Sequence, residues 1–358
     1  MDKFDILSAS YESLVAFIMQ LGEKEYRAGQ IFGWMHRANV LSFGEMTNLP
    51  LSLRQKLSEL AGFPAIRCVN SKTSKETTKH LFEIANHNII EQGGIFIEAV
   101  LMEYKHGYSV CLSTQAGCRM GCDFCASGIT GLDRNLTTGE MLAQLYTINR
   151  ELLSHGHKGV SNIVLMGIGE PLDNYDAAIG FIKLANDPRG LNIGQRHITL
   201  STCGIVPKIY ALLSEGLQIT LAISLHAPND SIRRAIMPIA KAYNMDELLA
   251  AAKAYGEHRR VSFEYIMIDG VNDKAEHAEE LATRLRGISG HVNLIPMNRV
   301  IGKPYNKPNM QTINKFAKTL SKYIETTVRR ELGSDISAAC GQLRSQAAQT
   351  ILLSEDRI

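Results

Sequence analysis

Three cysteines lie within eight residues of one another, at Cys118, Cys122 and Cys125. Thiolates are soft ligands, and three of them on one short loop can hold three irons of a cubane iron–sulfur cluster. The fourth iron then has no protein ligand and stays open to a small molecule. A structural zinc site would need a fourth ligand close by, usually from a second Cys-x-x-Cys or a His pair. Because the sequence directly after the loop has neither, the spacing favours a cluster with one open iron over zinc or a disulfide.

Other polar or glycine-rich runs could add groups to the same site, because each follows a segment that has the pattern of a buried strand. These runs are Gly167-Ile168-Gly169-Glu170-Pro171, Ser201-Thr202-Cys203-Gly204, Ser224-Leu225-His226, and Asn298 after Ile295-Pro296. Taken singly, a glycine-rich run is usually a turn and a lone histidine is usually a hydrogen-bonded core residue. Chemistry in parallel α/β folds sits at the carboxyl ends of the strands. We therefore expect these runs to meet in one pocket.

The elements that must position these groups alternate between strands and helices from residue 109 onward. Strands are predicted over Ser109–Thr114, Asn162–Met166, His197–Ser201, Ile219–Ser224, Val261–Met267, Val292–Ile295 and Thr326–Arg330. Amphipathic helices are predicted over Gly139–Leu153, Tyr175–Ala185, Val206–Ser214, Met245–Tyr255, Ala275–Leu285 and Thr312–Tyr323. This alternation is typical of a parallel α/β sheet with right-handed crossovers. About six βα units are too few to close a barrel, so the sequence predicts an open, partial (β/α)6 barrel.

The chain before this barrel has a different pattern and is predicted to form a small accessory domain over residues 1–95. Its expected elements are helices over Tyr11–Leu21, Ala28–His36 and Leu51–Ala61, then antiparallel strands over Lys79–Ile84 and Ile95–Met102. Basic residues among the helices suit either an RNA-binding surface or an ordinary solvated one, and charge alone does not decide between them. The barrel is expected over residues 96–335, and residues 336–358 form a separate C-terminal segment.

Composition narrows the class of protein. The 358 residues are 45% hydrophobic, enough for a sizeable core, and the net charge is only +2 from 38 basic and 36 acidic residues. A protein that holds nucleic acid by phosphate neutralisation alone would usually be more basic. Three of the seven cysteines share one motif, which suits a reducing compartment better than a disulfide framework. With no leader-like or long apolar segment, we expect a cytoplasmic protein without membrane contact.

The motifs together resemble one enzyme family. The Cys-x3-Cys-x2-Cys spacing with Phe124 before the third cysteine is similar to that of radical S-adenosylmethionine (SAM) enzymes, and further stretches resemble the RlmN/Cfr family of RNA adenosine methyltransferases. These stretches are Cys111-Leu-Ser-Thr-Gln-Ala-Gly-Cys118, Gly169-Glu170-Pro171-Leu172, Ser224-Leu-His-Ala-Pro-Asn229, Val271-Asn-Asp273 with Glu276-His277, and Asp335-Ile-Ser-Ala-Ala-Cys-Gly-Gln-Leu343. The resemblance spans essentially the whole chain. It implies a radical SAM partial barrel with a small N-terminal helical domain and a C-terminal active-site loop.

The resemblance also implies cofactors and a division of labour among the cysteines. Cys118, Cys122 and Cys125 would hold a [4Fe–4S] cluster that cleaves SAM to a 5′-deoxyadenosyl radical. Cys340 would carry a methyl group as S-methylcysteine, lose a hydrogen atom to the radical, and bind the RNA base covalently. Cys111 would form a transient disulfide with Cys340 that a reductant reopens. Glu98 aligns with a proton acceptor of the family, although a thiolate at Cys111 could also take the proton.

SAM contacts follow from the same resemblance. Gly169 and Glu170 would meet the amino group of SAM, since a carboxylate accepts hydrogen bonds from an ammonium. The carboxylate, ribose or adenine of SAM would be held by Ser201, Ser224, Leu225, His226 and Asn298. One residue departs from the family pattern: Cys203 stands where relatives often carry serine or another small residue, and we expect an inert core thiol there.

The implied substrate is adenosine C2 in 23S rRNA near the peptidyl-transferase centre, and in many relatives also the adenosine 3′ of the tRNA anticodon. An electron donor of the flavodoxin type is implied as a further partner. A Cfr-type methyltransferase acting on adenine C8 shares the cluster and both outer cysteines, but Gly169-Glu170-Pro171 favours C2. A noncatalytic iron–sulfur RNA-binding protein is a third hypothesis. The pair Cys111 and Cys340 argues against it, because a binding protein has no use for two spare reactive thiols.

Overall fold

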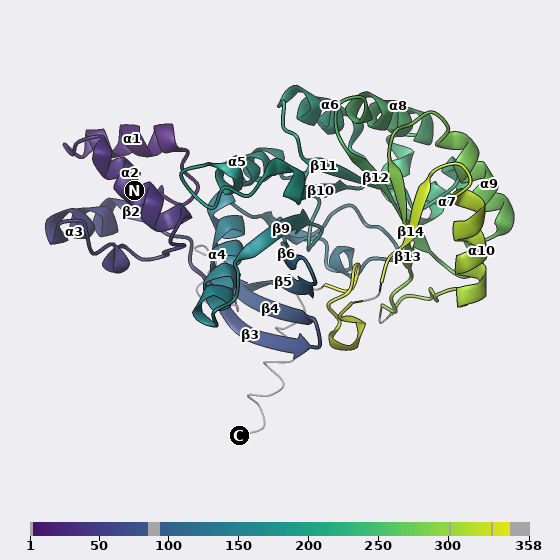
Figure 1. Ribbon diagram of the computed structural model, residues 1–358, viewed down its shortest axis with the longest axis horizontal. Helices are drawn as coiled ribbons and strands as arrows, with labels where there is room; N and C mark the ends of the chain where they lie inside the picture. The colour runs from purple at the N-terminus through teal and green to yellow at the C-terminus, as the bar shows by residue number, and fades with distance from the viewer. Residues whose placement is uncertain (1–2, 85–93, 301, 331, 344–358) are drawn as a thin grey trace, which may run out of the picture.

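A single mixed sheet runs through most of the molecule (Figure 1). The computed structural model describes residues 3–84, 94–300, 302–330 and 332–343. In these ranges the large sheet has ten strands in the order β14-β13-β12-β11-β10-β9-β6-β5-β4-β3. The strands are β3 (Ile66–Ser74), β4 (Thr77–Ile84), β5 (Ile95–Tyr104), β6 (Gly107–Cys111), β9 (Val160–Leu165), β10 (Ile198–Thr202), β11 (Thr220–Ser224), β12 (Val261–Met267), β13 (His291–Pro296) and β14 (Glu325–Val328).

The half of the sheet from β6 to β14 is parallel and confirms the predicted partial barrel. Its helices are α4 (Thr138–Ser154), α5 (Tyr175–Asn186), α6 (Val206–Ser214), α7 (Asp230–Ile236), α8 (Met245–Gly256), α9 (Ala275–Arg284) and α10 (Met310–Leu320). Every residue of β12 is buried, as expected for a parallel strand covered on both faces. The sequence prediction lacked α7, because only Arg233 and Ile236 of that short helix are buried and they form no apolar stripe.

The other half, β3 to β6, is antiparallel. β4 and β5 pair antiparallel as predicted, with Leu81 opposite Glu98, and β5 pairs with β6. The strand β3 is absent from the sequence prediction, because none of its residues is buried and its pattern has no apolar face. Hydrogen bonds therefore run across the boundary expected near residue 95, from the hairpin into the barrel sheet. That boundary stays a prediction, and residues 344–358 of the expected C-terminal segment lie outside the described residues.

The N-terminal helices form a separate lobe at the left of Figure 1. They are α1 (Tyr11–Gln20), α2 (Tyr26–His36) and α3 (Leu51–Leu60), with a short parallel pair of β1 (Phe4–Asp5) and β2 (Ala61–Gly62). The lobe joins the barrel through His36, whose Nδ1 lies 2.6 Å from the Tyr146 hydroxyl of α4. Burial lowers the pKa of His36 to about 3, so the ring is neutral at pH 7.

Side-chain caps fix where several barrel helices begin. Thr137 before α4 and Asn244 before α8 each form a capping box with the glutamate three residues on, which pairs backbone N–H groups that the helix leaves free. Asn229 before α7 and Asn309 before α10 form simpler caps, in which the side-chain oxygen accepts one hydrogen bond from a backbone N–H of the first turn. In the described ranges, none of the helices has the length and apolar character needed to cross a membrane.

Candidate active site

The three-cysteine loop lies at the carboxyl end of β6, as the sequence pattern predicts. The chain leaves β6 through β7 (Gln115–Gly117), which pairs with β8 (Leu132–Asn135). Gly117 has a φ of +75°, and a Cβ there would collide with the Gly131 carbonyl oxygen, so only glycine fits this turn. The loop is then tied down by backbone hydrogen bonds from Asp123 N to Ile236 O at 2.9 Å and from Ala126 N to Gly341 O at 2.8 Å. It therefore contacts both α7 and the C-terminal segment.

One pocket brings the three cysteines together with most of the residues assigned to SAM. The predicted site residues on its walls are Cys118, Cys122, Cys125, Gly169, Glu170, Ser201, Ser224, His226 and Cys340. They come from the ends of β6, β9, β10 and β11 and from the C-terminal segment, which are far apart in the sequence. The expectation of a shared pocket at one edge of the sheet is met for these residues.

The cysteine thiols of this pocket are in a setting that disfavours free thiolates. Burial raises the pKa of Cys118 to about 12, and burial together with Cys125 raises that of Cys122 further. Thiolates in such a place need a bound cation, and soft sulfur donors suit iron. Among the described residues, no three His, Cys, Asp or Glu side chains are close enough together to bind the same metal ion. In a cubane each thiolate binds a different iron, so this donor set fits a cluster.

Gly169 and Glu170 follow β9 as a tight turn against the first loop. Gly169 has a φ of +110°, and a Cβ there would lie 2.6 Å from the Cβ of Gln115, so the turn requires glycine. The buried Glu170 carboxylate accepts hydrogen bonds from the backbone N–H of Cys203 at 2.7 Å and of Leu172 at 3.0 Å. Burial raises its pKa in spite of these bonds. A carboxylate in this position is suited to pairing with an ammonium group.

His226 follows β11 and is held in one orientation. Its φ of +58° is unusual for a non-glycine residue, and its Nδ1 accepts a hydrogen bond from Ile266 N at 3.0 Å. The proton of the neutral ring is therefore on Nε2. Burial, with Arg233 nearby, lowers its pKa to about 3. The ring packs edge-on against Phe124, with centroids 4.9 Å apart, and offers the pocket a neutral donor.

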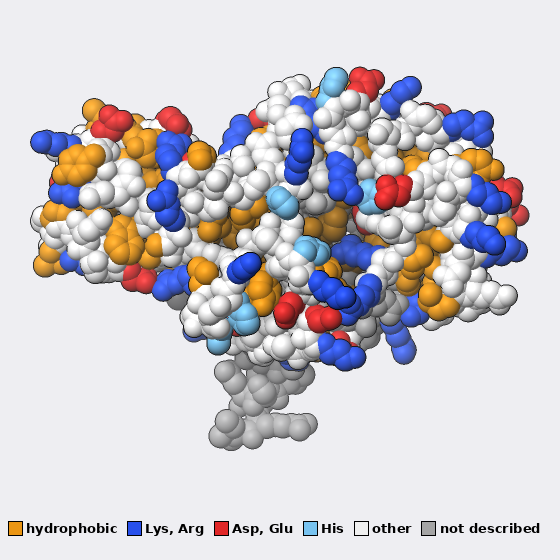
Figure 2. All heavy atoms as spheres, in the orientation of Figure 1, with side chains coloured by type: hydrophobic (Ala, Val, Ile, Leu, Met, Phe, Trp, Pro, Cys, Tyr) orange, Lys and Arg blue, Asp and Glu red, His pale blue; other side chains and the backbone are white. Residues whose placement is uncertain are grey.

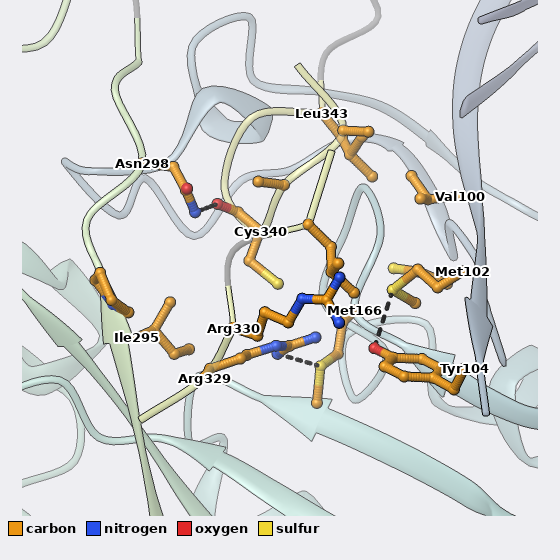
Figure 3. Close-up of a pocket in the computed structure, with 15 residues that line it drawn as sticks. Val100, Met102, Tyr104, Met166, Ile295, Asn298, Arg329, Arg330, Cys340 and Leu343 are labelled. Carbon is orange, nitrogen blue, oxygen red and sulfur yellow. Dashed lines mark hydrogen bonds between the residues drawn. The ribbon is translucent and has the colours of Figure 1, made fainter. Parts of the chain in front are cut away.

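A second pocket adjoins the first and contains both outer cysteines (Figure 3). Cys111 and Cys340 line it together with Arg329, and Cys340 and Arg329 line the first pocket as well. Burial, reinforced by Cys340, raises the pKa of Cys111 to about 12. Asn298 also lies here, where its Nδ2 donates to the Cys340 carbonyl at 3.2 Å. Its assignment to SAM stays a prediction.

Two of the predicted residues, Glu98 and Leu225, do not line either pocket in the described part of the chain. Glu98 is on β5, beside the thiol pocket, and its carboxylate pairs with Lys79 Nζ at 2.8 Å. Lys79 also donates to the carbonyl of Ser337 at 3.3 Å, so it links Glu98 to the segment that carries Cys340. Leu225 is buried behind the first pocket, where its carbonyl accepts from Arg233. The Lys79 contacts therefore connect Glu98 to the segment that carries Cys340.

Sequence reasoning missed several charged residues of the site. Glu264 lies in the middle of the buried strand β12, and an acidic residue in such an apolar run was a usable signal. Its Oε1 accepts from Ser262 and Asn293, while its Oε2 lies 4.0 Å from Arg329. Arg329 follows β14 directly, and nothing in the local sequence distinguishes it from an exposed arginine. Cys203, expected as an inert thiol, is buried in the pocket wall, and burial raises its pKa well above normal.

Three basic residues near the cysteine loop, Arg119, Arg134 and Lys303, are paired with carboxylates. Arg119 pairs with Asp173, and Arg134 forms a two-pronged pair with Glu140. Lys303 Nζ lies 2.9 Å from an oxygen of Asp123 in the cysteine loop. Figure 2 shows Lys and Arg side chains spread over the visible face with acidic ones among them. Because these pairs hold loops in place, the three basic residues are weaker candidates for RNA contacts than basic residues without a carboxylate partner.

Comparison with known proteins agrees with this geometry. A sequence model of the Radical SAM superfamily matches residues 112–282, and one of the ribosomal RNA large subunit methyltransferase N-terminal domain matches residues 4–62. A protein of Clostridium novyi named "probable dual-specificity RNA methyltransferase RlmN" is 49% identical over 345 residues, covering 95% of this chain and 97% of the relative. A protein of the same name from Symbiobacterium thermophilum is 50% identical over 347 residues, covering 94% and 90%.

A solved structure is similar along almost the whole chain. The radical SAM methyltransferase from Sphaerobacter thermophilus has a TM-score of 0.91 to this protein at 42% identity, covering 96% of this chain and 100% of that one. Radical SAM enzymes use a [4Fe–4S] cluster and SAM, which are the cofactors the three-cysteine pocket fits. The family predicted from the motifs is thus confirmed, and the chain belongs to the RlmN family of radical SAM methyltransferases.

Proposed function

We propose that this protein methylates C2 of adenosine in RNA, in the cytoplasm. The targets are an adenosine near the peptidyl-transferase centre of 23S rRNA and the adenosine 3′ of the tRNA anticodon. The names of its relatives support an RNA substrate, and their "dual-specificity" supports two kinds of RNA. The observation that carries the proposal is the position of Cys340, which lines both the three-cysteine pocket and the pocket with Cys111.

Radical chemistry suits this substrate carbon. C2 of adenine is electron-poor, so it does not displace a methyl group from SAM as a nucleophile, whereas a carbon radical can add to it. When bound at Cys118, Cys122 and Cys125, the cluster supplies the electron that cleaves SAM to a 5′-deoxyadenosyl radical. Glu170 and His226 would hold SAM, because a buried carboxylate and a neutral ring donor complement its ammonium group and its acceptor oxygens.

The two outer thiols then handle the methyl group. The Cys340 sulfur takes a methyl group from one SAM molecule, giving S-methylcysteine and S-adenosylhomocysteine. After the S-methyl group has lost a hydrogen atom, its carbon bonds to C2 and joins the RNA to Cys340. The adduct radical must then lose the C2 proton and one electron; Glu98 or Cys111 accepts the proton, and the electron would return to the oxidised cluster or its one-electron donor. The Cys111 sulfur next attacks the Cys340 sulfur, which breaks the bond from sulfur to the methylene carbon. That carbon takes a proton, and a dithiol reductant reopens the disulfide.

Further partners follow from this chemistry. A one-electron donor of the flavodoxin type is required to reduce the cluster before each radical step. An RNA base must also leave its stack to reach Cys340, so the protein should bind an unpaired or flipped adenosine. The basic residues of the N-terminal helices, including the exposed Arg37, are candidates for phosphate contacts.

The reaction product tests the proposal. The reconstituted protein is incubated without oxygen with SAM, a reductant and unmodified 23S rRNA or tRNA, and the digested nucleosides are separated by chromatography. We expect 2-methyladenosine, and a Cys340→Ala protein treated in the same way should give none. The product 8-methyladenosine would contradict the C2 assignment and identify the Cfr-type activity. Absence of any product with intact SAM would favour an RNA-binding protein.

A further inference from the structure

Arg233 is a buried arginine to which the reaction assigns no role. It lies on α7 and has 0% of its surface exposed. Its guanidinium donates to backbone carbonyls, at 2.6 Å to Cys203 and at 3.3 Å to Leu225, with a longer bond to Ser224. These carbonyls follow or end β10 and β11, so the side chain lies directly behind the loops that form the pocket wall.

Among the described residues no carboxylate forms an ion pair with Arg233, and Asp230 on the same helix acts on its charge only from a longer distance. Within the described ranges its Nη1 is buried and has no hydrogen-bond partner. A buried charge is normally paired with an opposite charge, because moving an ion from water into the protein interior costs on the order of several kcal/mol. Burial accordingly lowers the pKa of Arg233, and the sulfur atoms of Cys203 and Cys122 are the first groups that oppose this effect. The site is therefore arranged to receive an anion close to Cys122.

The contacts of α7 place this charge against the cysteine loop. Asp123 N donates to Ile236 O at 2.9 Å, which fixes the loop to the end of the helix. Ile236 also packs in one apolar cluster with Phe124 and Cys203, against which Cys122 packs as well. The helix, its arginine and the metal-binding loop thus form one packed unit.

We propose that Arg233 is the fixed positive charge that stabilises the reduced state of the iron–sulfur cluster and so sets its reduction potential. The inference depends on the family cofactor being bound at Cys118, Cys122 and Cys125. A cluster with three thiolates is an anion, and the electron it takes up makes it more negative. A cation held in a buried, low-dielectric place lowers the cost of that electron much more than a surface charge does. Arg233 is a positioning residue, because it acts on SAM only through the cluster.

A purely structural role for Arg233 makes a different prediction. If its function were only to satisfy the carbonyls of Cys203 and Leu225, then any neutral donor of similar size would replace it without a change in the cluster. If its charge matters, a lysine should preserve the potential even though it loses the planar fork and some of these bonds. The two roles are therefore separated by Arg233→Lys and Arg233→Gln. Both variants are expected to be less stable than the wild type.

The test is a redox titration of the reconstituted full-length protein without SAM and RNA, followed by electron paramagnetic resonance of the reduced cluster. At a fixed potential near the wild-type midpoint, we expect the ratio of reduced to oxidised cluster to fall about tenfold in Arg233→Gln and Arg233→Met. This corresponds to a midpoint potential about 59 mV lower for a one-electron couple. Arg233→Lys should stay near the wild-type midpoint. Arg234→Met is the matched control, because Arg234 is exposed on the same helix, and it should leave the midpoint unchanged.

The outcomes are distinguishable. Iron and sulfide analysis first establishes equal cluster content in all variants. If Arg233→Met does not fold, Arg233→Gln still provides the neutral variant. A wild-type midpoint in the neutral variants, or an equal shift in Arg234→Met, would refute the inference. A wild-type protein that forms no reducible cluster would instead refute the cofactor assignment on which the inference depends.

Discussion

The two groups of cysteines each lie beside a guanidinium, buried in one case and half-buried in the other, and the two guanidiniums have different surroundings. Arg233, behind the cluster loop, donates to backbone carbonyls and retains a buried Nη1 without a partner among the described residues. Arg329, in the thiol pocket, has Glu264 at 4.0 Å and faces the side chains of Cys340 and Cys111. Figure 3 shows Arg329 against the Met166 sulfur, across the pocket from the loop that carries Cys340.

The difference indicates two uses of a positive charge at the site. Cys340 and Glu264 raise the pKa of Arg329, so this arginine has a counter-charge in the protein itself, at Glu264. Burial lowers the pKa of Arg233, and in our proposal its balancing anion is the cluster. On this account the thiol pocket has a counter-charge in the protein itself, whereas the cluster pocket receives one with its cofactor. Variants in the two regions should consequently fail in different ways.

The largest expected difference is between one cysteine from each region. Cys122→Ala should remove cluster binding, and with it both reductive SAM cleavage and RNA methylation. Cys340→Ala should also abolish RNA methylation, because it removes the methyl carrier, but should keep the cluster and the capacity to cleave SAM. Iron content, 5′-deoxyadenosine and methylated nucleoside are measured in parallel. Loss of the cluster in Cys340→Ala would show that the two regions are not separable.

A smaller effect is expected from the hairpin that supports the thiol pocket. The pair of Lys79 and Glu98 is mostly buried, with side chains 14% and 9% exposed, and Lys79 also holds Ser337. Lys79→Met should lower the free energy of unfolding by about 3 kcal/mol, because it breaks a mostly buried ion pair by removing one partner. Urea unfolding measures this change.

An ion pair between β4 and the neighbouring strand β3, whose arginine is exposed, is the matched control. Arg67 contacts Glu83 with its side chain 75% exposed, so Arg67→Met should cost less than about 1 kcal/mol. Equal losses of stability in Arg67→Met and Lys79→Met would contradict the idea that this hairpin anchors the Cys340 segment through a buried charge.

Periodicity predicted the barrel well, because each buried strand and each amphipathic helix carries its own pattern. The strand at Val261–Met267 and the helix at Val206–Ser214 have the predicted bounds, and the other barrel elements differ by a few residues at their ends. The polar runs after these strands were also predicted to meet, since the ends of parallel strands share an edge. Where local pattern decides the structure, the sequence was sufficient.

The rest could not be predicted, because it depends on residues that are distant in the sequence. β3 has no buried residue, and its place in the sheet comes from its pairing with β4. The contacts of Lys79 with the Cys340 segment join opposite ends of the chain. Arg233 has the local sequence of an ordinary helix, and only its position behind Cys203 makes it a buried cation. Charges of this kind become visible only when the fold is known.

The central claim is that Cys340 carries the methyl group and Cys111 releases the product. Its most direct test is the Cys111→Ala protein, incubated without oxygen with SAM, reductant and RNA, then digested and examined by mass spectrometry. We predict RNA joined through a methylene carbon to Cys340, with little free methylated product, because the thiol that breaks the bond is missing. Free product at the wild-type rate, or an adduct on another residue, would contradict the claim.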